Sequence, residues 1–236
     1  MNWVRRARND LAFRTHFDFE RSPFNFGLSI MHISEGVLSG PVLLSGAALA
    51  AAGTAIGLKK LDYDQIAKAG MLSGAFFVAS LIHVPLGPTS VHLIMNGLVG
   101  LLLGWAAFPA ILVALTLQAV FFQFGGITTL GVNTFLMALP AVLCYFAFSP
   151  LLFHRQPMVV MAASFACGFL SVFMAGVIAS LALMFTEESF WSVAAMVVAA
   201  HIPIMVIEGV ITALCIVFLK KVQPSMLPAF SRKDSL

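Results

Sequence analysis

No Asp, Glu, Lys or Arg residue occurs between Lys68 and Arg155. Across the whole chain, 60% of the residues are hydrophobic, 10% are charged, and the mean hydropathy is +0.98. A soluble domain carries about 25% charged residues. An uncharged stretch of this length can only hold several hydrophobic spans joined by short loops. The sequence therefore predicts an all-α integral membrane protein in a lipid bilayer, and no basic, aromatic tract indicates a nucleic-acid partner.

Apolar segments of about 20 residues, the length that crosses a bilayer core, recur from residue 40 onward. We expect about seven transmembrane helices, arranged as a six-helix bundle plus an N-terminal span. Because the third and fourth segments are short, the count could differ by one. The predicted spans are residues 40–58, 66–86, 91–108, 109–124, 130–153, 157–185 and 191–219.

Residues 1–30 differ from the rest of the chain, because they carry five arginines among three acidic residues. They lack the apolar core of a secretory signal. We expect an N-terminal extension outside the fold, either a short cytoplasmic tail or translation upstream of a true start at Met31.

Lysine and arginine in the predicted loops indicate the orientation, because they are enriched on the cytoplasmic side of membranes. Their alternation places the C-terminal residues 225–236 in the cytoplasm and Met31 outside. The arginines of residues 1–30 would then lie on the wrong side, which favours a start at Met31 or removal of the extension. The basic residues used are Lys59, Lys60, Lys68, Arg155, Lys220, Lys221, Arg232 and Lys233.

His32 directly follows Met31. If Met31 were the first residue, its amine, the His32 amide nitrogen and His32 Nδ1 could chelate one metal ion. A second imidazole could complete a nitrogen-rich, roughly planar site, which suits late divalent first-row metals. A histidine also follows a methionine often by chance, so this pair alone is a weak signal.

His92 follows a loop whose Gly87 and Pro88 favour irregular backbone, tolerated at membrane depth where it lines a cavity. Thr89 or Ser90 could cap the next helix or orient an imidazole. His92 is either a metal ligand or an interfacial histidine. The same two interpretations apply to His83, at the end of the second predicted span.

His201 and Glu208 lie seven residues apart in the last predicted span, on one helical face. A carboxylate in hydrocarbon costs about 2.5–3.5 kcal/mol on insertion scales, so it should face the bundle interior with a partner. Glu208 either serves an ion path or subunit docking, or makes a structural hydrogen bond to a neighbouring helix. Other polar residues in or near the spans are interpreted as contacts between helices; they are Asn96, Gln118, Gln123 and Asn133.

The sequence contains no GxxxxGK[ST], GxSxG or HExxH motif. We therefore do not expect an enzyme, and any ATP hydrolysis would occur in separate chains. One alternative is a stand-alone ion-coupled secondary transporter with Glu208 and His201 as a proton relay. Another is an intramembrane enzyme, but the spans hold no paired nucleophile and base.

Four segments, MHISEGVLSG, VPLGPTSVHL, FGGITTLGVNTFLMALP and HIPIMVIEGVITA, occur in an order and spacing that resemble a known family. This is the substrate-capture subunit of energy-coupling-factor cobalt and nickel importers, in its cobalt-type form for cobalamin biosynthesis or its nickel-type relative. The resemblance covers residues 31–224, which would form the transmembrane metal-capture domain. Residues 1–30 have no counterpart.

The resemblance implies capture of Co²⁺ for uptake, with Ni²⁺ as the alternative substrate and no cofactor, in a bacterial or archaeal cell membrane. It implies three metal-binding residues, Met31, His32 and His92, with nitrogen from the Met31 amine. It also implies four partners: an integral membrane coupling subunit, a small accessory membrane subunit and a pair of cytoplasmic ATPases. The family begins at the methionine of MHI, whereas Met31 is internal here, so the amine ligand is lost if the extension persists.

Overall fold

A computed structural model describes residues 32–86, 89–186 and 191–227, with side chains described outside residues 84–91 and 191–200. The predicted extension, residues 1–30, and Met31 lie outside the described residues, as does most of the predicted tail. The described part is almost entirely helical, as predicted, and a short antiparallel hairpin interrupts it.

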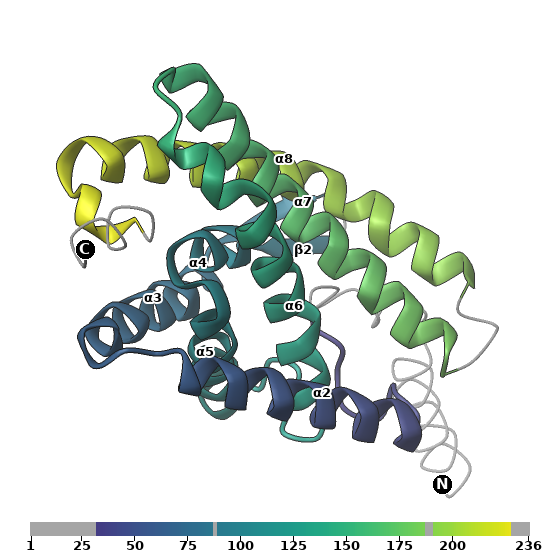
Figure 1. The fold of residues 1–236 in the computed structure, drawn as a ribbon. Helices are drawn as coiled ribbons and strands as arrows, with labels where there is room; N and C mark the ends of the chain where they lie inside the picture. The colour runs from purple at the N-terminus through teal and green to yellow at the C-terminus, as the bar shows by residue number, and fades with distance from the viewer. Residues whose placement is uncertain (1–31, 87–88, 187–190, 228–236) are drawn as a thin grey trace, which may run out of the picture.

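The elements follow the predicted order along the chain (Figure 1). The α-helices are α2 (Gly40–Lys59), α3 (Ile66–Ala79), α4 (Asn96–Leu103), α5 (Ala107–Phe122), α6 (Leu130–Phe148), α7 (Pro157–Met184) and α8 (Trp191–Val222). The hairpin strands are β1 (His83–Leu86) and β2 (Thr89–His92). Short 3-10 turns are η2 (Tyr63–Gln65), η3 (Gly104–Ala106), η4 (Ser149–Phe153) and η6 (Pro224–Met226).

The expected count of seven membrane spans is not confirmed. Among the described residues, five helical segments are long and apolar enough to cross a bilayer: Gly40–Lys59, Asn96–Phe122, Leu130–Phe153, Pro157–Met184 and His201–Val222. The segment predicted at 66–86 is helical only in α3 and ends in strand β1. The 14 residues of α3 rise about 21 Å, less than the roughly 30 Å of a hydrocarbon core.

The segments predicted at 91–108 and 109–124 form one apolar stretch that is broken rather than ended. The break is η3, where Gly104 has a φ of +57°. A left-handed φ costs glycine little, so the chain changes direction there without a polar loop. Hydrophobicity alone does not distinguish such a break from a turn between two spans.

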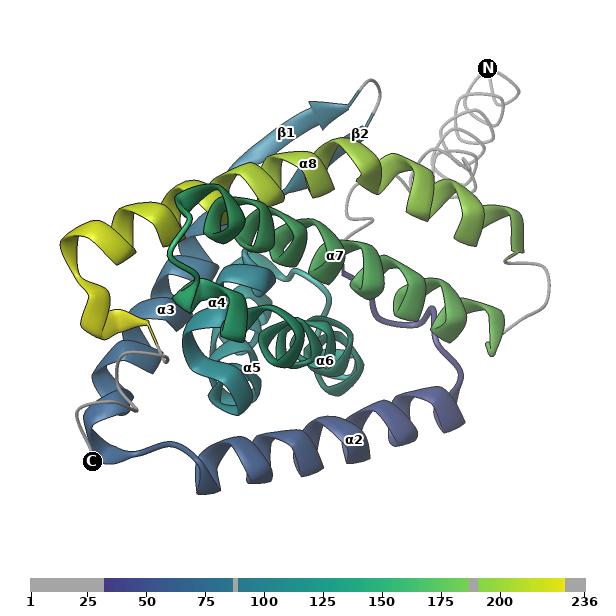
Figure 2. The ribbon, with the colours of Figure 1, turned by 45° about the horizontal axis from the view of Figure 1, so that its top comes forward.

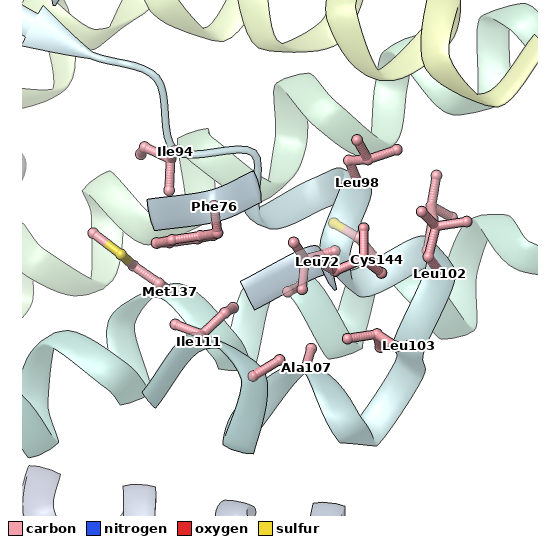
Figure 3. Packing of buried hydrophobic residues seen from close by; sticks show 14 of the residues in the cluster. Leu72, Phe76, Ile94, Leu98, Leu102, Leu103, Ala107, Ile111, Met137 and Cys144 are labelled. Atoms are coloured by element: carbon pink, nitrogen blue, oxygen red, sulfur yellow. The ribbon is translucent and has the colours of Figure 1, made fainter. Parts of the chain in front are cut away.

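Helices α7 and α8 run side by side along one side of the molecule, and α2 lies on the opposite side (Figures 1 and 2). Helices α4, α5 and α6 lie between them. The hairpin lies beside α8, and Figure 2 shows it projecting from the bundle there. The main hydrophobic core gathers in the middle layer, and Figure 3 shows Phe76 of α3, Ile94, Ile111 of α5 and Met137 of α6 meeting there.

Small residues let α4 approach its neighbours closely, as is common where helices pack within a membrane. A Cβ atom on Gly100 would lie 2.3 Å from the carbonyl oxygen of Ala141 in α6. On the α7 side, a Cβ on Gly97 would lie 2.8 Å from the Gly168 Cα. The backbone of α4 is therefore wedged between α6 and α7, and its position is fixed on two sides.

We predict that Gly100→Ala lowers the free energy of unfolding by about 1–3 kcal/mol, because the backbone of α6 must shift to admit the methyl group. Gly176 in α7 is the matched control, since a Cβ there meets nothing within 4 Å. Gly176→Ala should be neutral or stabilising by up to about 1 kcal/mol. Thermal unfolding in detergent measures both; equal melting temperatures for the two variants would contradict the close approach.

Candidate metal centre

Residues 32–39 form a non-helical segment that leads into the bundle. A side chain of α6 holds this segment through hydrogen bonds to the backbone of the segment. The Ile33 N–H donates to Asn133 Oδ1 at 3.1 Å, and Asn133 Nδ2 donates to the Ile33 carbonyl at 3.1 Å. One side chain thus pairs both backbone groups of a buried residue, as a neighbouring strand would. Asn133 Nδ2 also donates to Thr129 Oγ1 at 3.2 Å, which fixes the orientation of the amide.

The loop between α5 and α6 receives the next part of this segment. The Glu35 N–H donates to the Gly125 carbonyl at 3.1 Å, and the Glu35 carboxylate accepts from the Thr128 N–H at 3.1 Å. Gly126 has a φ of +128°, and a Cβ there would lie 2.1 Å from Glu35 Cγ. Only glycine allows the loop to take this conformation and the carboxylate to approach.

His32 and His92 come together at the inner end of this segment. Their ring centroids are 4.9 Å apart with an interplanar angle of 24°. The rings are 2% and 3% exposed, respectively. Phe124 stacks on His92, at 6.2 Å between centroids and an angle of 4°. The structure therefore brings two histidines 60 positions apart in sequence into one buried contact.

The hairpin carries His92 and pairs it with His83 across the two strands. The two rings meet edge to face, with centroids 6.0 Å apart, but the His83 side chain is exposed. His92 Nδ1 lies 2.9 Å from the Leu93 carbonyl oxygen. A carbonyl can only accept, so Nδ1 carries the proton and Nε2 presents its lone pair.

Both buried imidazoles are neutral at physiological pH. Burial, together with the neighbouring His92, lowers the pKa of His32 to about 3, against a smaller opposing effect of Gln118. Burial also lowers the pKa of His92 to about 4; the Leu93 carbonyl opposes this, while His83 and His201 add to it. Neutral imidazole is the form that binds metal ions.

Three nitrogens of this pair have no hydrogen-bond partner within the described residues: both ring nitrogens of His32 and Nε2 of His92. Buried polar atoms are nearly always paired. The Gln118 amide, which affects the pKa of His32, also lacks a hydrogen bond of normal geometry in the described part of the chain. A cation that accepts nitrogen lone pairs would pair one free nitrogen of each imidazole, so the donor set fits a metal ion.

No three His, Cys, Asp or Glu side chains converge into a metal site among the residues that the structure describes. Side chains there supply two imidazoles, and any further ligand must come from elsewhere, such as backbone nitrogen. Met31 lies outside the described residues. Thr89 and Ser90 lie in β2, but their side chains are not described.

His201 and Glu208 both lie buried in α8. His201 is close enough to His92 to lower its pKa. The Glu208 carboxylate accepts hydrogen bonds from the backbone N–H groups of Ile94 and Met95, just after His92. Glu208 therefore makes a structural hydrogen bond, which was one of its two interpretations. The partner is the loop before α4 rather than a neighbouring helix.

The sequence does not identify Asn133 and Gln118 as site residues, because it predicts contacts between helices for both. That interpretation is confirmed for Asn96, whose Nδ2 lies 3.2 Å from the Met137 carbonyl and 3.4 Å from the Ser171 carbonyl. Asn133 holds a non-helical segment instead. A polar residue inside an apolar run was the available signal, but its partner is 100 residues away.

We predict that Asn133→Ala releases the N-terminal segment, because the Ile33 N–H and C=O lose their partners at about 1–3 kcal/mol each. Hydrogen exchange of the peptide containing residues 32–39 should accelerate in metal-free protein. Asn96→Ala is the control, since it removes a buried asparagine that does not touch this segment. If the two variants exchange equally in residues 32–39, Asn133 does not hold the segment.

Comparison with known proteins identifies the family to which this chain belongs. The family model for the cobalt uptake substrate-specific transmembrane region, CbiM, matches residues 32–226. A Haemophilus influenzae protein named for metal transport is 43% identical over 84% of this chain and 97% of its own. The cobalt transport protein CbiM of Sorangium cellulosum is 31% identical over 84% and 94%. A crystal structure of a transition metal transporter has a TM-score of 0.66 and 25% identity, covering 81% of this chain and 93% of its own. The chain therefore belongs to the CbiM family of cobalt uptake substrate-specific transmembrane regions.

Proposed function

We propose that this chain captures a divalent transition-metal ion at the membrane for uptake, with Co²⁺ as the substrate and Ni²⁺ as the alternative. The observation that carries the proposal is the buried pair of neutral imidazoles with unpaired ring nitrogens. Apolar surroundings leave such nitrogens uncompensated unless a ligand accepts their lone pairs.

The ligands we propose are nitrogen atoms of Met31, His32 and His92. His92 would bind through Nε2, because its Nδ1 donates to the Leu93 carbonyl. His32 would bind through Nδ1, which can form a chelate ring with the amide nitrogen of the same residue. The Met31 amine would be the fourth nitrogen, provided that the mature chain begins there. Four nitrogen ligands in a plane suit late first-row divalent ions.

The choice of Co²⁺ rests on the family description and on the resemblance of the opening motif. Ligand chemistry does not favour it, since four nitrogens suit Ni²⁺ at least as well. Supply of cobalt for cobalamin biosynthesis follows from the same resemblance.

We further propose that the chain is the substrate-specific subunit of an energy-coupling-factor importer. An integral membrane coupling subunit, a small accessory membrane subunit and a cytoplasmic ATPase pair would complete it. The family description as a substrate-specific region and the lack of a nucleotide-binding motif in the sequence support this division of labour. With Met31 outside and the C-terminus in the cytoplasm, the metal site would face the side from which metal arrives.

We predict that His92→Ala lowers the affinity for Co²⁺ and Ni²⁺ by more than about 100-fold, beyond the 10–100-fold that loss of an outer partner costs. Titration of the purified full chain with each metal measures this. His154→Ala is the matched control, because His154 is exposed in the connection between α6 and α7. Unchanged affinity in His92→Ala would exclude His92 as a ligand.

We predict that the protein purified from its native membrane begins at Met31 and carries about one equivalent of Co or Ni, as an amine-anchored nitrogen site requires. Intact mass, N-terminal sequencing and metal analysis of one sample test this together. Tight metal binding by a chain that begins at Met1 would contradict the amine ligand. His83, His92 and His201 would then be the ligand set to mutate.

A further inference from the structure

Glu208 is a fully buried carboxylate in α8 that bonds only to backbone among its described partners. Its Oε1 accepts from the Ile94 and Met95 N–H groups, the latter at 2.9 Å, and its Oε2 lies 2.9 Å from the same Met95 nitrogen. Both carboxyl oxygens face backbone N–H groups of one segment. This interaction therefore ties α8 to the segment between β2 and α4.

One of these N–H groups belongs to Met95, the cap residue of α4, and the other to Ile94 just before it. In a capping box, the side chain at the third helical position accepts from the N–H of the cap residue. Here the cap residue is Met95, with a left-handed φ of +57°, and the third helical position is Leu98, whose side chain has no acceptor. Glu208, more than 110 positions away, supplies the missing acceptor.

The hydrogen bond to Ile94 also links Glu208 to His92, beyond its effect on the start of α4. The Ile94 N–H and the Leu93 C=O belong to one planar peptide unit. The Leu93 oxygen accepts from His92 Nδ1 at 2.9 Å, and the Ile94 N–H donates to Glu208 Oε1. A hydrogen-bonded chain thus runs from Glu208 through one peptide group to the His92 ring.

We infer that Glu208 is a positioning residue of the metal site, acting on the metal through the Leu93–Ile94 peptide and His92. The inference rests on the proposed metal capture. A metal-binding histidine is generally held by a hydrogen bond from its other ring nitrogen, which fixes the tautomer and the ring orientation. The carboxylate polarises the peptide, which strengthens the acceptor for Nδ1–H, and Nε2 is kept unprotonated for the metal.

This role makes α8 a support of the site, although α8 contributes neither of the paired imidazoles. Gly168 of α7 lies against the Glu208 backbone, where a Cβ would come within 2.6 Å of the Glu208 carbonyl oxygen. The carboxylate is therefore set by the close packing of α7 on α8. A shift of α8 along α7 would move the peptide that holds His92.

Two substitutions separate the parts of this chain of bonds. Glu208→Asp keeps the carboxyl group but withdraws it by about 1.5 Å, one carbon–carbon bond. Glu208→Gln keeps the length and one accepting oxygen but places an amide donor against the Met95 N–H. Thr212→Val is the matched control, because Thr212 lies one turn further along α8, is buried, and makes no side-chain hydrogen bond among the described residues.

The test uses the full chain in detergent and three readouts: Co²⁺ and Ni²⁺ affinity, the visible absorption spectrum of the bound ion, and the His92 tautomer in metal-free, ¹⁵N-histidine-labelled protein. We expect Glu208→Asp to lower metal affinity about 10–100-fold, to shift the spectrum, and to mix the Nδ1–H and Nε2–H tautomers. Glu208→Gln should fall between Glu208→Asp and wild type. Thr212→Val should match wild type in all three.

Wild-type affinity, spectrum and tautomer in Glu208→Asp would overturn the role of Glu208 while leaving metal capture intact. If Glu208→Asp does not accumulate, Glu208→Gln decides by the same criterion. A wild-type chain that binds neither metal would refute the proposed function itself. In that case the tautomer in the metal-free protein still reports whether Glu208 orients His92.

Discussion

Two stretches of this chain leave helical geometry inside an otherwise apolar bundle, and their backbone polar groups need partners that a helix would have supplied. These are residues 32–39 and the segment from the hairpin into α4. An unpaired buried N–H or C=O costs about 1–3 kcal/mol, so neither stretch could stay inside on apolar packing alone. Asn133 pairs the first with α6, and Glu208 pairs the second with α8. The position of the two buried histidines depends on these side-chain-to-backbone bonds.

The chemistry of the site follows from where these bonds place the imidazoles. His32 and His92 are almost fully buried, and Phe124 stacks against both rings, so burial keeps both imidazoles neutral. Burial of a neutral ring whose nitrogen has no hydrogen-bond partner costs desolvation free energy that no bond offsets. A divalent ion with a preference for nitrogen would provide that bond, and its binding would stabilise the folded state by mass action.

Much of the helix arrangement could be predicted from the sequence, because apolar length is a local property. Residues 40–58 and 130–153 were predicted within one residue of the candidate spans Gly40–Lys59 and Leu130–Phe153. The number of spans could not be predicted, because α3 and the segment broken at Gly104 are as apolar as the helices that are long enough to cross a bilayer. Their short helical length and backbone turn depend on packing against other helices.

The site was predictable only in part, for a similar reason. His32 can be identified in the sequence because it follows Met31, and His92 because it follows the loop of Gly87 and Pro88. The structure brings the two rings together. Asn133 and Glu208 show no local pattern that identifies their partners, which lie 100 and more than 110 positions away. A polar residue in an apolar helix indicates that a hydrogen-bond partner exists, but only the fold determines which residue that partner is.

The close burial of the two rings has a kinetic consequence. Because His32 and His92 are 2% and 3% exposed, the described residues leave little open surface through which an ion bound to both could exchange with water. Escape would require the N-terminal segment to lift away and break both Asn133 bonds to Ile33. Those bonds then enter the activation barrier for dissociation, so residence time rather than encounter rate would carry most of the affinity. An ion held this way would stay until another event displaces the segment.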